Sequence, residues 1–273
     1  MTLSTSGFKT LFRRRVFALA FTALASLPAL AEVNAREIIE KANLASLYAG
    51  DDGRAEARMK ITDPQNRVQF RQFTILRKDV LDGADQNFYV IFSRPDEVAR
   101  TVFLVNKHTD RDDDRWLYLP GLDLVKRIAA GDKRTSFVGS HFYYEDISGR
   151  NLNADHYRLL EDNADYYVIE ATPKEPSQVE FSRYVIQISK VHSLPLKAEY
   201  YDAQNKLYRV AETLEVQTID GHPTGTKLVM KDLRDGGQTE TEMRFIKYDA
   251  GLPQSIFTER SMRVPPVEWL KRG

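Results

Sequence analysis

The chain has 273 residues, with 39 Lys and Arg balanced by 39 Asp and Glu, and it contains no cysteine. This balance argues against a nucleic-acid-binding protein, which needs a net basic face. Without cysteine there is no disulfide framework, so a hydrophobic core must hold the fold, and a chain of this length can bury one.

The first 31 residues have the pattern of a secretory signal peptide. Lys9 and Arg13-Arg14-Arg15 precede the apolar run VFALAFTALASLPALA, which ends in Ala29-Leu30-Ala31. This run is shorter than the roughly 20 residues that a membrane-spanning helix needs, so cleavage after Ala31 is favoured over a membrane anchor. Cleavage leaves 242 residues (273 minus 31) with 35 basic and 39 acidic side chains. We expect residues 32–273 to form a single domain, free in the periplasm because no cysteine can carry a lipid.

One amphipathic helix is predicted at the start of the mature chain. Asn34 and Glu37 have the spacing of a helix capping box. The apolar positions that follow with a helical period are Ala35, Ile38, Ile39, Ala42 and Ala45. Since the opposite face carries both Glu and Lys, packing on a sheet is favoured over binding to a membrane surface. We therefore interpret it as a lid helix, with Ile38, Ile39 and Ala42 on its apolar face.

From residue 54 on, the pattern changes to the alternation that is typical of β-strands, with polar turns between the strands. The predicted strands are Arg54–Thr62, Arg67–Lys78, Asn87–Ser93, Thr101–Asn106, Arg115–Leu119, Tyr166–Thr172, Phe181–Ser189, Leu196–Tyr201, Leu207–Gln217, Thr226–Leu233 and Thr239–Tyr248. A short return strand is also expected within residues 122–128. Short polar connections indicate antiparallel hairpins. About eleven long strands are too many for a flat sheet, so we predict a mainly β (α+β) fold with a strongly curved sheet or incomplete barrel. Residues 134–163 break the alternation and are predicted to be a helical or irregular cover.

Two local patterns bear on metal binding and catalysis. In the acidic run HTDRDDDR (108–115), a calcium loop that starts at Asp110 would have Arg115 and Gly121 where glycine and glutamate are required, so a charged hairpin tip is favoured. Ser140 lacks the G-x-S-x-G setting of a hydrolase, and His141 is not part of an H-E-x-x-H pattern. We predict no catalytic residue, no metal site, no cofactor and no enzymatic activity, although a triad assembled from distant positions stays open as an alternative.

The segment from Trp116 to Ile147 carries a family resemblance. Its W-L-Y-L-P, K-R-I and F-V-G-S-H-F-Y-Y-E-D-I motifs, together with RYVIQISKVHSLPLKAEYYD and FIKYDAGLPQSIFTERSM further on, resemble the LolA-like group of outer membrane lipoprotein-sorting proteins. The resemblance covers nearly all of the mature chain. It implies an incomplete β-barrel whose helical lid encloses a hydrophobic cavity, and periplasmic transport of lipidated cargo.

The strand pattern and this resemblance together lead to a functional prediction. We expect a soluble periplasmic carrier that binds acyl chains of lipoproteins or lipids and moves them toward the outer membrane. Its expected partners are an inner-membrane transporter of the RND or ABC type and an outer-membrane acceptor, with no nucleic acid. The alternative is a non-enzymatic sensor or accessory module that partners a membrane transporter. Lys126 and Arg127 are candidate headgroup contacts. The candidate cavity residues are Phe70, Phe88, Val90, Phe92, Trp116, Tyr118, Tyr184, Ile186, Tyr208 and Phe245.

Overall fold

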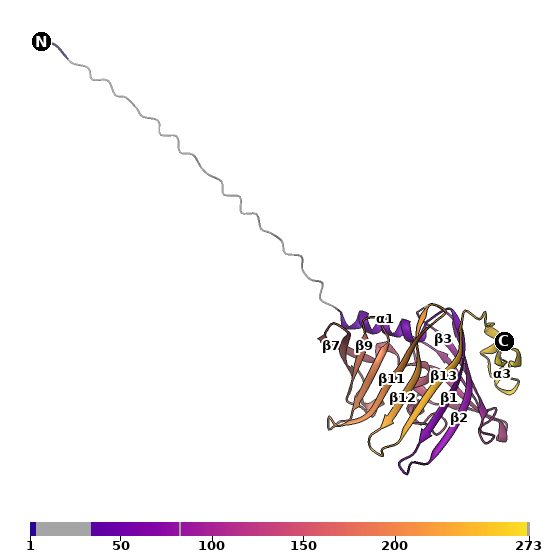
Figure 1. Cartoon of the computed structure of the whole chain (residues 1–273). Coiled ribbons are helices and arrows are strands. Elements are labelled where there is room, and N and C mark those ends of the chain that lie inside the picture. Colours follow the sequence, from indigo (N-terminus) through magenta and orange to yellow (C-terminus); the bar gives the residue numbers. More distant parts are fainter. Residues whose placement is uncertain (4–33, 82, 272–273) are drawn as a thin grey trace. The chain divides into compact units, whose positions relative to one another are not determined.

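The computed structural model describes residues 1–3, 34–81 and 83–271, so the predicted signal peptide lies almost entirely outside the described residues. From residue 34 on, the chain builds one large antiparallel sheet of thirteen strands in the order β6-β5-β4-β3-β2-β1-β13-β12-β11-β10-β9-β8-β7. The sheet is strongly curved but not closed, since β6 and β7 remain as two separate edges (Figure 1). The predicted fold class is confirmed.

The strands run through most of the chain. They are β1 (Asp52–Thr62), β2 (Val68–Asp79), β3 (Gln86–Arg94), β4 (Val102–Lys107), β5 (Asp114–Leu119), β6 (Leu124–Ile128), β7 (Asp155–Asp162), β8 (Tyr166–Pro173), β9 (Arg183–Ser189), β10 (Pro195–Tyr201), β11 (Leu207–Ile219), β12 (His222–Asp232) and β13 (Gln238–Tyr248). The α-helices are α1 (Ala35–Leu47), α2 (Tyr144–Ser148), α3 (Glu259–Arg263) and α4 (Val267–Leu270). Short 3₁₀ turns complete the list at Pro120–Leu122, Ala130–Asp132, Leu152–Ala154, Pro176–Gln178 and Gln254–Ile256.

The strand count corrects the prediction of about eleven. The short return strand expected within residues 122–128 is β6, and β7 falls inside residues 134–163, which were predicted to be helical or irregular. The sequence of β7, DHYRLLED, is mostly exposed because the strand lies at a sheet edge. An edge strand with charged side chains gives a weak apolar alternation, so its sequence does not stand out as a strand.

The two faces of the sheet carry separate cores, because successive side chains of a strand point to opposite sides. On β3, Phe88, Val90 and Phe92 belong to one apolar cluster, whereas Tyr89 and Ile91 belong to another. The second cluster is covered by the C-terminal segment, which contributes Leu252, Ile256, Phe257 and Met262. Figure 1 shows α3 of this segment on the outer side of this half of the sheet.

Residues 129–154 join β6 to β7 and therefore run from one edge of the sheet to the other. We call this segment the strap. Its Phe137 is completely buried on the concave face, with ring centroids 5.5 Å from Phe92, 5.6 Å from Phe103 and 6.1 Å from Phe73. The strap is thus rich in aromatic residues because it fills part of the hollow of the curved sheet.

Helix α1 begins as predicted. The Asn34 side chain accepts a hydrogen bond from the Arg36 backbone at 2.9 Å and caps the helix, which then runs two residues beyond the predicted stretch to Leu47. Arg36 Nη1 donates to the Leu152 carbonyl of the strap at 2.7 Å, and Arg77 of β2 donates to the Leu47 carbonyl at 2.8 Å. Both ends of α1 are therefore fastened to other elements, and the helix lies across one end of the sheet (Figure 1). In the described part of the chain, no helix is long and apolar enough to cross a membrane.

Candidate functional site: an apolar pocket in the curved sheet

A pocket of about 410 Å³ remains on the concave face beside the strap. It lies between the C-terminal end of α1, the strap, and strands from both halves of the sheet. Its volume is in the range of small-molecule sites. The apolar lining from β1–β3 consists of Ala55, Met59, Phe73, Ile75 and Phe88. The apolar lining from β10–β13 includes Leu196, Ala198, Ala211, Leu228, Val229, Met243 and Ile246.

Charged side chains that reach the pocket are mostly engaged elsewhere. Arg77 binds the carbonyls at the end of α1 and pairs with Asp79 at 2.7 Å. Asp146 of the strap pairs with Arg209 of β11. By contrast, the Thr241 hydroxyl is buried and has no hydrogen-bond partner within the described ranges. The interior therefore suits an apolar ligand, because few of its charges are available to bind a polar one.

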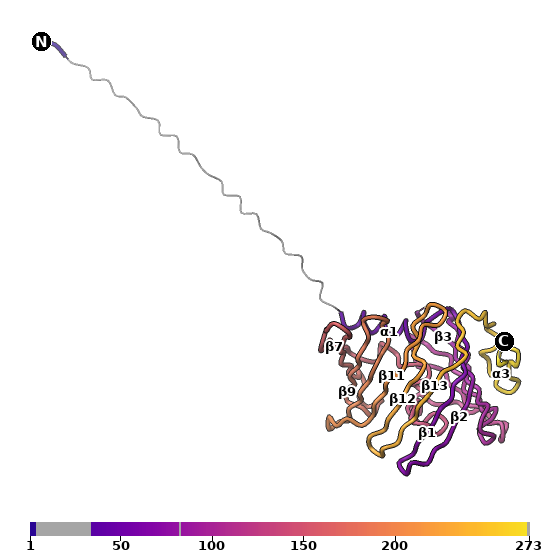
Figure 2. The backbone as a smooth tube through the Cα atoms, in the orientation of Figure 1, coloured from indigo at the N-terminus to yellow at the C-terminus, as the bar shows by residue number. Residues whose placement is uncertain are grey.

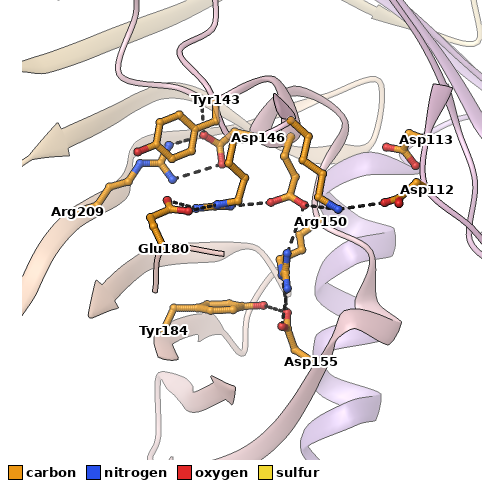
Figure 3. Close-up of polar contacts among 12 residues, drawn as sticks. Asp112, Asp113, Tyr143, Asp146, Arg150, Asp155, Glu180, Tyr184 and Arg209 are labelled. Atoms are coloured by element: carbon orange, nitrogen blue, oxygen red, sulfur yellow. Dashed lines mark hydrogen bonds and ion pairs between the residues drawn. The ribbon is translucent and has the colours of Figure 1, made fainter. Parts of the chain in front are cut away.

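An ion-pair network ties the strap to the far half of the sheet (Figure 3). Arg134 lies 2.6 Å from Glu145 and 2.7 Å from Glu180, and Arg150 lies 2.8 Å from Asp155. Tyr184 of β9 donates to Asp155 at 2.7 Å. Except for Glu180, whose side chain is 33% exposed, these groups are largely buried, so each charge needs its partners, and the network fixes the position of the strap.

Burial and pairing perturb the titration of these groups. Burial alone would raise the pKa of Glu180, but the hydrogen bond and charge of Arg134 outweigh it and lower that pKa. Where the strap meets β4, Lys107 is buried and donates to the Ser148 carbonyl at 2.8 Å. Burial lowers the pKa of Lys107 to about 8, since few charges compensate for its lost hydration.

The predicted cavity residues of the first half of the sheet lie on both faces. Phe88 lines the pocket. Val90 and Phe92 share its face and pack in the cluster beneath the strap. Trp116 and Tyr118 belong to the cluster on the opposite face, which the C-terminal segment covers.

The remaining candidates lie outside the pocket lining. Tyr184 and Tyr208 share a buried cluster with Phe181, and Ile186 packs partly against that cluster and the one beneath α1. Phe70 is 42% exposed and Phe245 is 54% exposed. The sequence pattern thus indicated which positions carry large apolar side chains, whereas their distribution over the two faces comes from the structure.

The structure also shows where the predicted lid residues and headgroup contacts lie. Ile38, Ile39 and Ala42 of α1 are buried against Ile169 and Ile188 of β8 and β9. It is the other end of the helix, Ala45–Leu47, that borders the pocket. Lys126 is exposed on β6, and Arg127 pairs with Asp114. Neither cation lines the pocket.

Sequence reasoning missed most of the lining from β10–β13. Ala198, Ala211, Thr213 and Gly225 are small residues on long strands, and such residues leave room on the face that they share. A search for small side chains within strands would have been the available signal. The cavity candidates predicted in β11 and β13, Tyr208 and Phe245, are large aromatic residues, and large side chains fill space rather than surround it.

Residues 108–113 of the acidic run form the loop between β4 and β5, and residues 114–115 begin β5, so the predicted charged hairpin tip is confirmed. The His108 ring lies 3.0 Å from Asp85 and 3.2 Å from Asp114. A second cavity of about 460 Å³ borders this loop and is lined mainly by its Arg and Asp side chains. These charges pair with one another, and within residues 34–81 and 83–271 no group of three or more acidic or histidine side chains could hold a metal ion.

The residues tested for catalysis do not meet as a nucleophile and base. Ser140 Oγ accepts a hydrogen bond from the Phe142 backbone at 3.2 Å. The His141 ring lies 2.8 Å from the Thr239 hydroxyl. Burial lowers the pKa of His141, which leaves its ring neutral near pH 7. The Ser140 contact lies within the strap, and the His141 contact holds the strap on β13.

Comparisons with known proteins agree with this geometry. A family model described as an uncharacterized protein matches residues 84–264. A DUF1329 family protein from Desulfovibrio piger is 30% identical, with a TM-score of 0.75, over 82% of this chain and 97% of that one. A structure named as an outer membrane lipoprotein-sorting protein domain from Vibrio parahaemolyticus is 27% identical, with a TM-score of 0.77, over 84% of this chain and 98% of that one. No curated protein matches the chain.

The chain belongs to the LolA-like family. A LolA superfamily protein from Nitrosomonas europaea shares its fold, with 21% identity and a TM-score of 0.65 over 84% of this chain and 99% of that one. The resemblance carried by the segment from Trp116 to Ile147 is thereby confirmed. In this LolA-like protein that segment comprises most of β5, all of β6 and most of the strap, that is, one edge of the sheet and the segment that fills part of the hollow. The LolA-like protein thus shares its fold with a structure named for outer membrane lipoprotein sorting and with one named for the LolA superfamily.

Proposed function

We propose that the protein is a periplasmic carrier that holds an acyl chain of a lipoprotein or lipid in the pocket of the curved sheet. The observation that carries this proposal is the apolar pocket of about 410 Å³, which the strap leaves open in the hollow. A hollow that was completely filled by the protein's own side chains would have argued against a carrier. The strap fills one part of it with Phe137 and Tyr144 and leaves the remainder accessible.

The energetics favour such a carrier. Each methylene removed from water contributes about 0.8 kcal/mol, so an acyl tail of about fifteen methylenes would cost on the order of 12 kcal/mol if it were left exposed. Unassisted passage between two membranes is correspondingly slow. A lining of aliphatic and small side chains binds the tail without directional contacts, so it can also release the tail to an acceptor.

Location and partners follow from the same proposal. The predicted signal peptide and the lipoprotein-sorting relatives support the periplasm as the place of action. An inner-membrane transporter and an outer-membrane acceptor are the partners that a carrier of this kind needs. The lack of a nucleophile–base pair among the tested residues supports a non-enzymatic role.

The test is native mass spectrometry of the mature protein after gentle purification from a Gram-negative periplasm. We expect mass increments of bound acyl lipid, which organic extraction removes and which a fluorescent fatty acid can replace. Protein that carries no lipid and takes up no fluorescent fatty acid would overturn the proposal. A sensor or accessory module would instead give a stable complex with a periplasmic domain and an empty pocket.

A further inference from the structure

The ladder between two central strands ends early, directly beside the pocket. The pairing of β12 with β13 stops at Lys227 and Glu242, although β12 begins at His222 and β13 ends at Tyr248. Each strand keeps its other neighbour over this length, since β12 pairs with β11 and β13 with β1. The two strands lie next to one another in the sheet (Figure 2). We call the unpaired stretch between residues 222–226 and residues 243–248 the slot.

The pocket reaches the slot from inside. Its lining includes Thr224 and Gly225 on the β12 side, and Met243, Ile246 and Tyr248 on the β13 side. The β12 side and the β13 side of the slot therefore both border the same apolar pocket. At this place the wall of the sheet beside the pocket therefore lacks the backbone hydrogen bonds that join β12 to β13 elsewhere.

The slot is closed by few contacts. The hydroxyls of Thr224 and Tyr248 lie 2.8 Å apart, and the rings of His222 and Tyr248 lie 4.9 Å apart. On its β11 side, the end of the β11–β12 hairpin also lacks a neighbouring strand, because β10 pairs with β11 only as far as Lys197 and Glu212. The end of this hairpin thus pairs with no third strand, and beyond the contacts above it is held to β13 by the hydrogen bond that the Tyr248 backbone donates to Asp220 at 3.2 Å. Few contacts therefore oppose a tilt of the hairpin end.

Polar groups at the slot lack partners within the protein. The hydroxyls of Thr226 and Thr241 belong to residues that are only 4% exposed, and neither has a hydrogen-bond partner among the residues that the structure describes. Buried hydroxyls are normally satisfied, so a ligand or water is expected to reach them. Both lie within one residue of the last ladder pair, at the inner end of the slot.

An exposed cation lies at the outer rim. Lys247 is exposed, lines the pocket, and makes no ion pair with any described residue. It is the cross-strand partner of Arg54, whose guanidinium donates to the Trp269 and Leu270 carbonyls of the C-terminal segment. Since cross-strand partners share a face, Lys247 lies on the outer side of the sheet.

We propose that an acyl chain enters the pocket through the slot and that Lys247 binds the anionic head, a phosphate or a carboxylate, which stays at the outer rim. The proposal rests on the acyl-binding function proposed above and adds to it the route and the head chemistry. The apolar chain would lie inside, the neck beside the unpaired threonine hydroxyls, and the charge outside. This order of environments matches a single-chain anionic amphiphile from tail to head.

The route is tested by stapling the slot. Because the chain has no cysteine, Thr224→Cys with Tyr248→Cys can be joined selectively by a short reducible crosslinker. The matched control joins Thr62→Cys with Val68→Cys, which are ladder partners at the far end of β1 and β2. We expect the slot staple to slow uptake of a fluorescent fatty acid at least tenfold, with recovery after reduction, and the control staple to leave uptake unchanged.

The outcomes of this experiment separate the two proposals. If the unstapled protein takes up the fatty acid and the slot staple does not slow this uptake, the slot is overturned as the route and the carrier function stands. A lack of uptake by the unstapled protein and by wild type would overturn the carrier function itself. Slowing by both staples alike would show a general stiffening of the sheet, and would also overturn the slot.

The head chemistry is tested with Lys247→Glu and matched ligands. We expect this variant to bind a fluorescent fatty acid about fivefold more weakly and its neutral methyl ester as tightly as wild type does. Lys206→Glu, in the exposed β10–β11 turn, should bind both ligands as wild type does. Equal effects of Lys247→Glu on acid and ester, or no effect on either, would overturn the head site. Displacement by lysophosphatidic acid but not by inorganic phosphate would identify a lipid head, whereas equal displacement by both would identify a free-anion site and overturn the proposal.

Discussion

At the scale of single residues, the charges inside the hollow are held by partners rather than by water. Arg209 is 1% exposed, pairs with Asp146, donates to the His141 carbonyl at 3.1 Å, and lies over the Tyr143 ring at 4.0 Å (Figure 3). Such a cation is costly to bury, and its partners offset that cost only while all of them remain. The strap therefore depends on this residue for its position on β11.

Asp146→Asn should destabilise the fold strongly, because it leaves the Arg209 charge buried without its counter-charge. We expect the free energy of unfolding in urea to fall by about 3 kcal/mol. The matched control is Arg244→Gln, which removes an exposed pair with Glu242 and should change stability by less than about 1 kcal/mol. A loss for Asp146→Asn no larger than for this control would contradict the role of the pair.

The lowered pKa of Lys107 makes the stability of the folded protein rise with pH. Burial lowers its pKa from 10.5 to about 8 in the folded state, so between these values the unfolded chain binds more protons and stability rises with pH. The penalty for burying the protonated amine is present in full below about pH 8 and lost above the unfolded pKa. The stability of wild type minus that of Lys107→Met should therefore rise by about 2 kcal/mol between about pH 8 and about pH 10, measured by urea unfolding. A difference that stays constant or falls over this interval would contradict the assignment.

At this scale, the sequence predicted which residues are apolar better than which way they point. Phe88 and Trp116 both stood out as large side chains on strands, yet Phe88 borders the pocket and Trp116 packs beneath the C-terminal segment. A shift of one residue moves a side chain to the opposite face, and both faces of this half of the sheet are covered. The alternation of apolar and polar residues that normally identifies the inner face is therefore weak here.

At the scale of elements, the strap also contacts α1 closely at the C-terminal end of the helix. Gly149 follows α2 with a φ of +77°, and a Cβ atom there would lie 2.4 Å from Leu47 Cδ1 at the end of α1. Lys107 and Arg77 bind carbonyls on the two sides of this contact, at Ser148 and Leu47. The cover of the pocket is thus one connected unit made from two distant parts of the chain.

Gly149→Ala should loosen this unit. The added methyl group clashes with Leu47 and the backbone conformation is unfavourable for a residue with a Cβ, so we expect a loss of about 1–3 kcal/mol in the free energy of unfolding. Gly121→Ala is the control, because nothing lies within 4 Å of a Cβ at Gly121, and it should change stability by less than about 0.5 kcal/mol. If both variants unfold at the same urea concentration, the contact does not hold the cover.

Elements with strong periodicity could be predicted, and those defined by long-range pairing could not. Helix α1 was predicted from its cap at Asn34 and its apolar face, because both signals are local. Strand β7 and the strap were not separated, since their structure depends on a sheet edge and on a hollow that residues 155–162 and 129–154 do not reveal on their own. The slot was likewise not predicted, because it depends on where two strands stop pairing, although Pro223 and Gly225 mark the start of β12 as an irregular stretch.

At the scale of the whole molecule, the fold is a curved wall whose hollow is partly filled from within. The strap, the helix and both halves of the sheet leave a space of about 410 Å³. The sequence predicted the curvature from the number of strands, but the size of the remaining space depends on side chains that meet only in the folded chain. The account as a whole depends on that space being the binding site for an acyl chain.

The most direct measurement is the affinity of a fluorescent fatty acid for a variant whose pocket is filled. Ala211→Trp places a large ring in the pocket lining, and Ala203→Trp places the same ring in the exposed β10–β11 turn. We predict that Ala211→Trp weakens binding at least tenfold while the protein stays folded, and that Ala203→Trp binds as wild type does. Unchanged affinity of the Ala211→Trp variant would contradict the account.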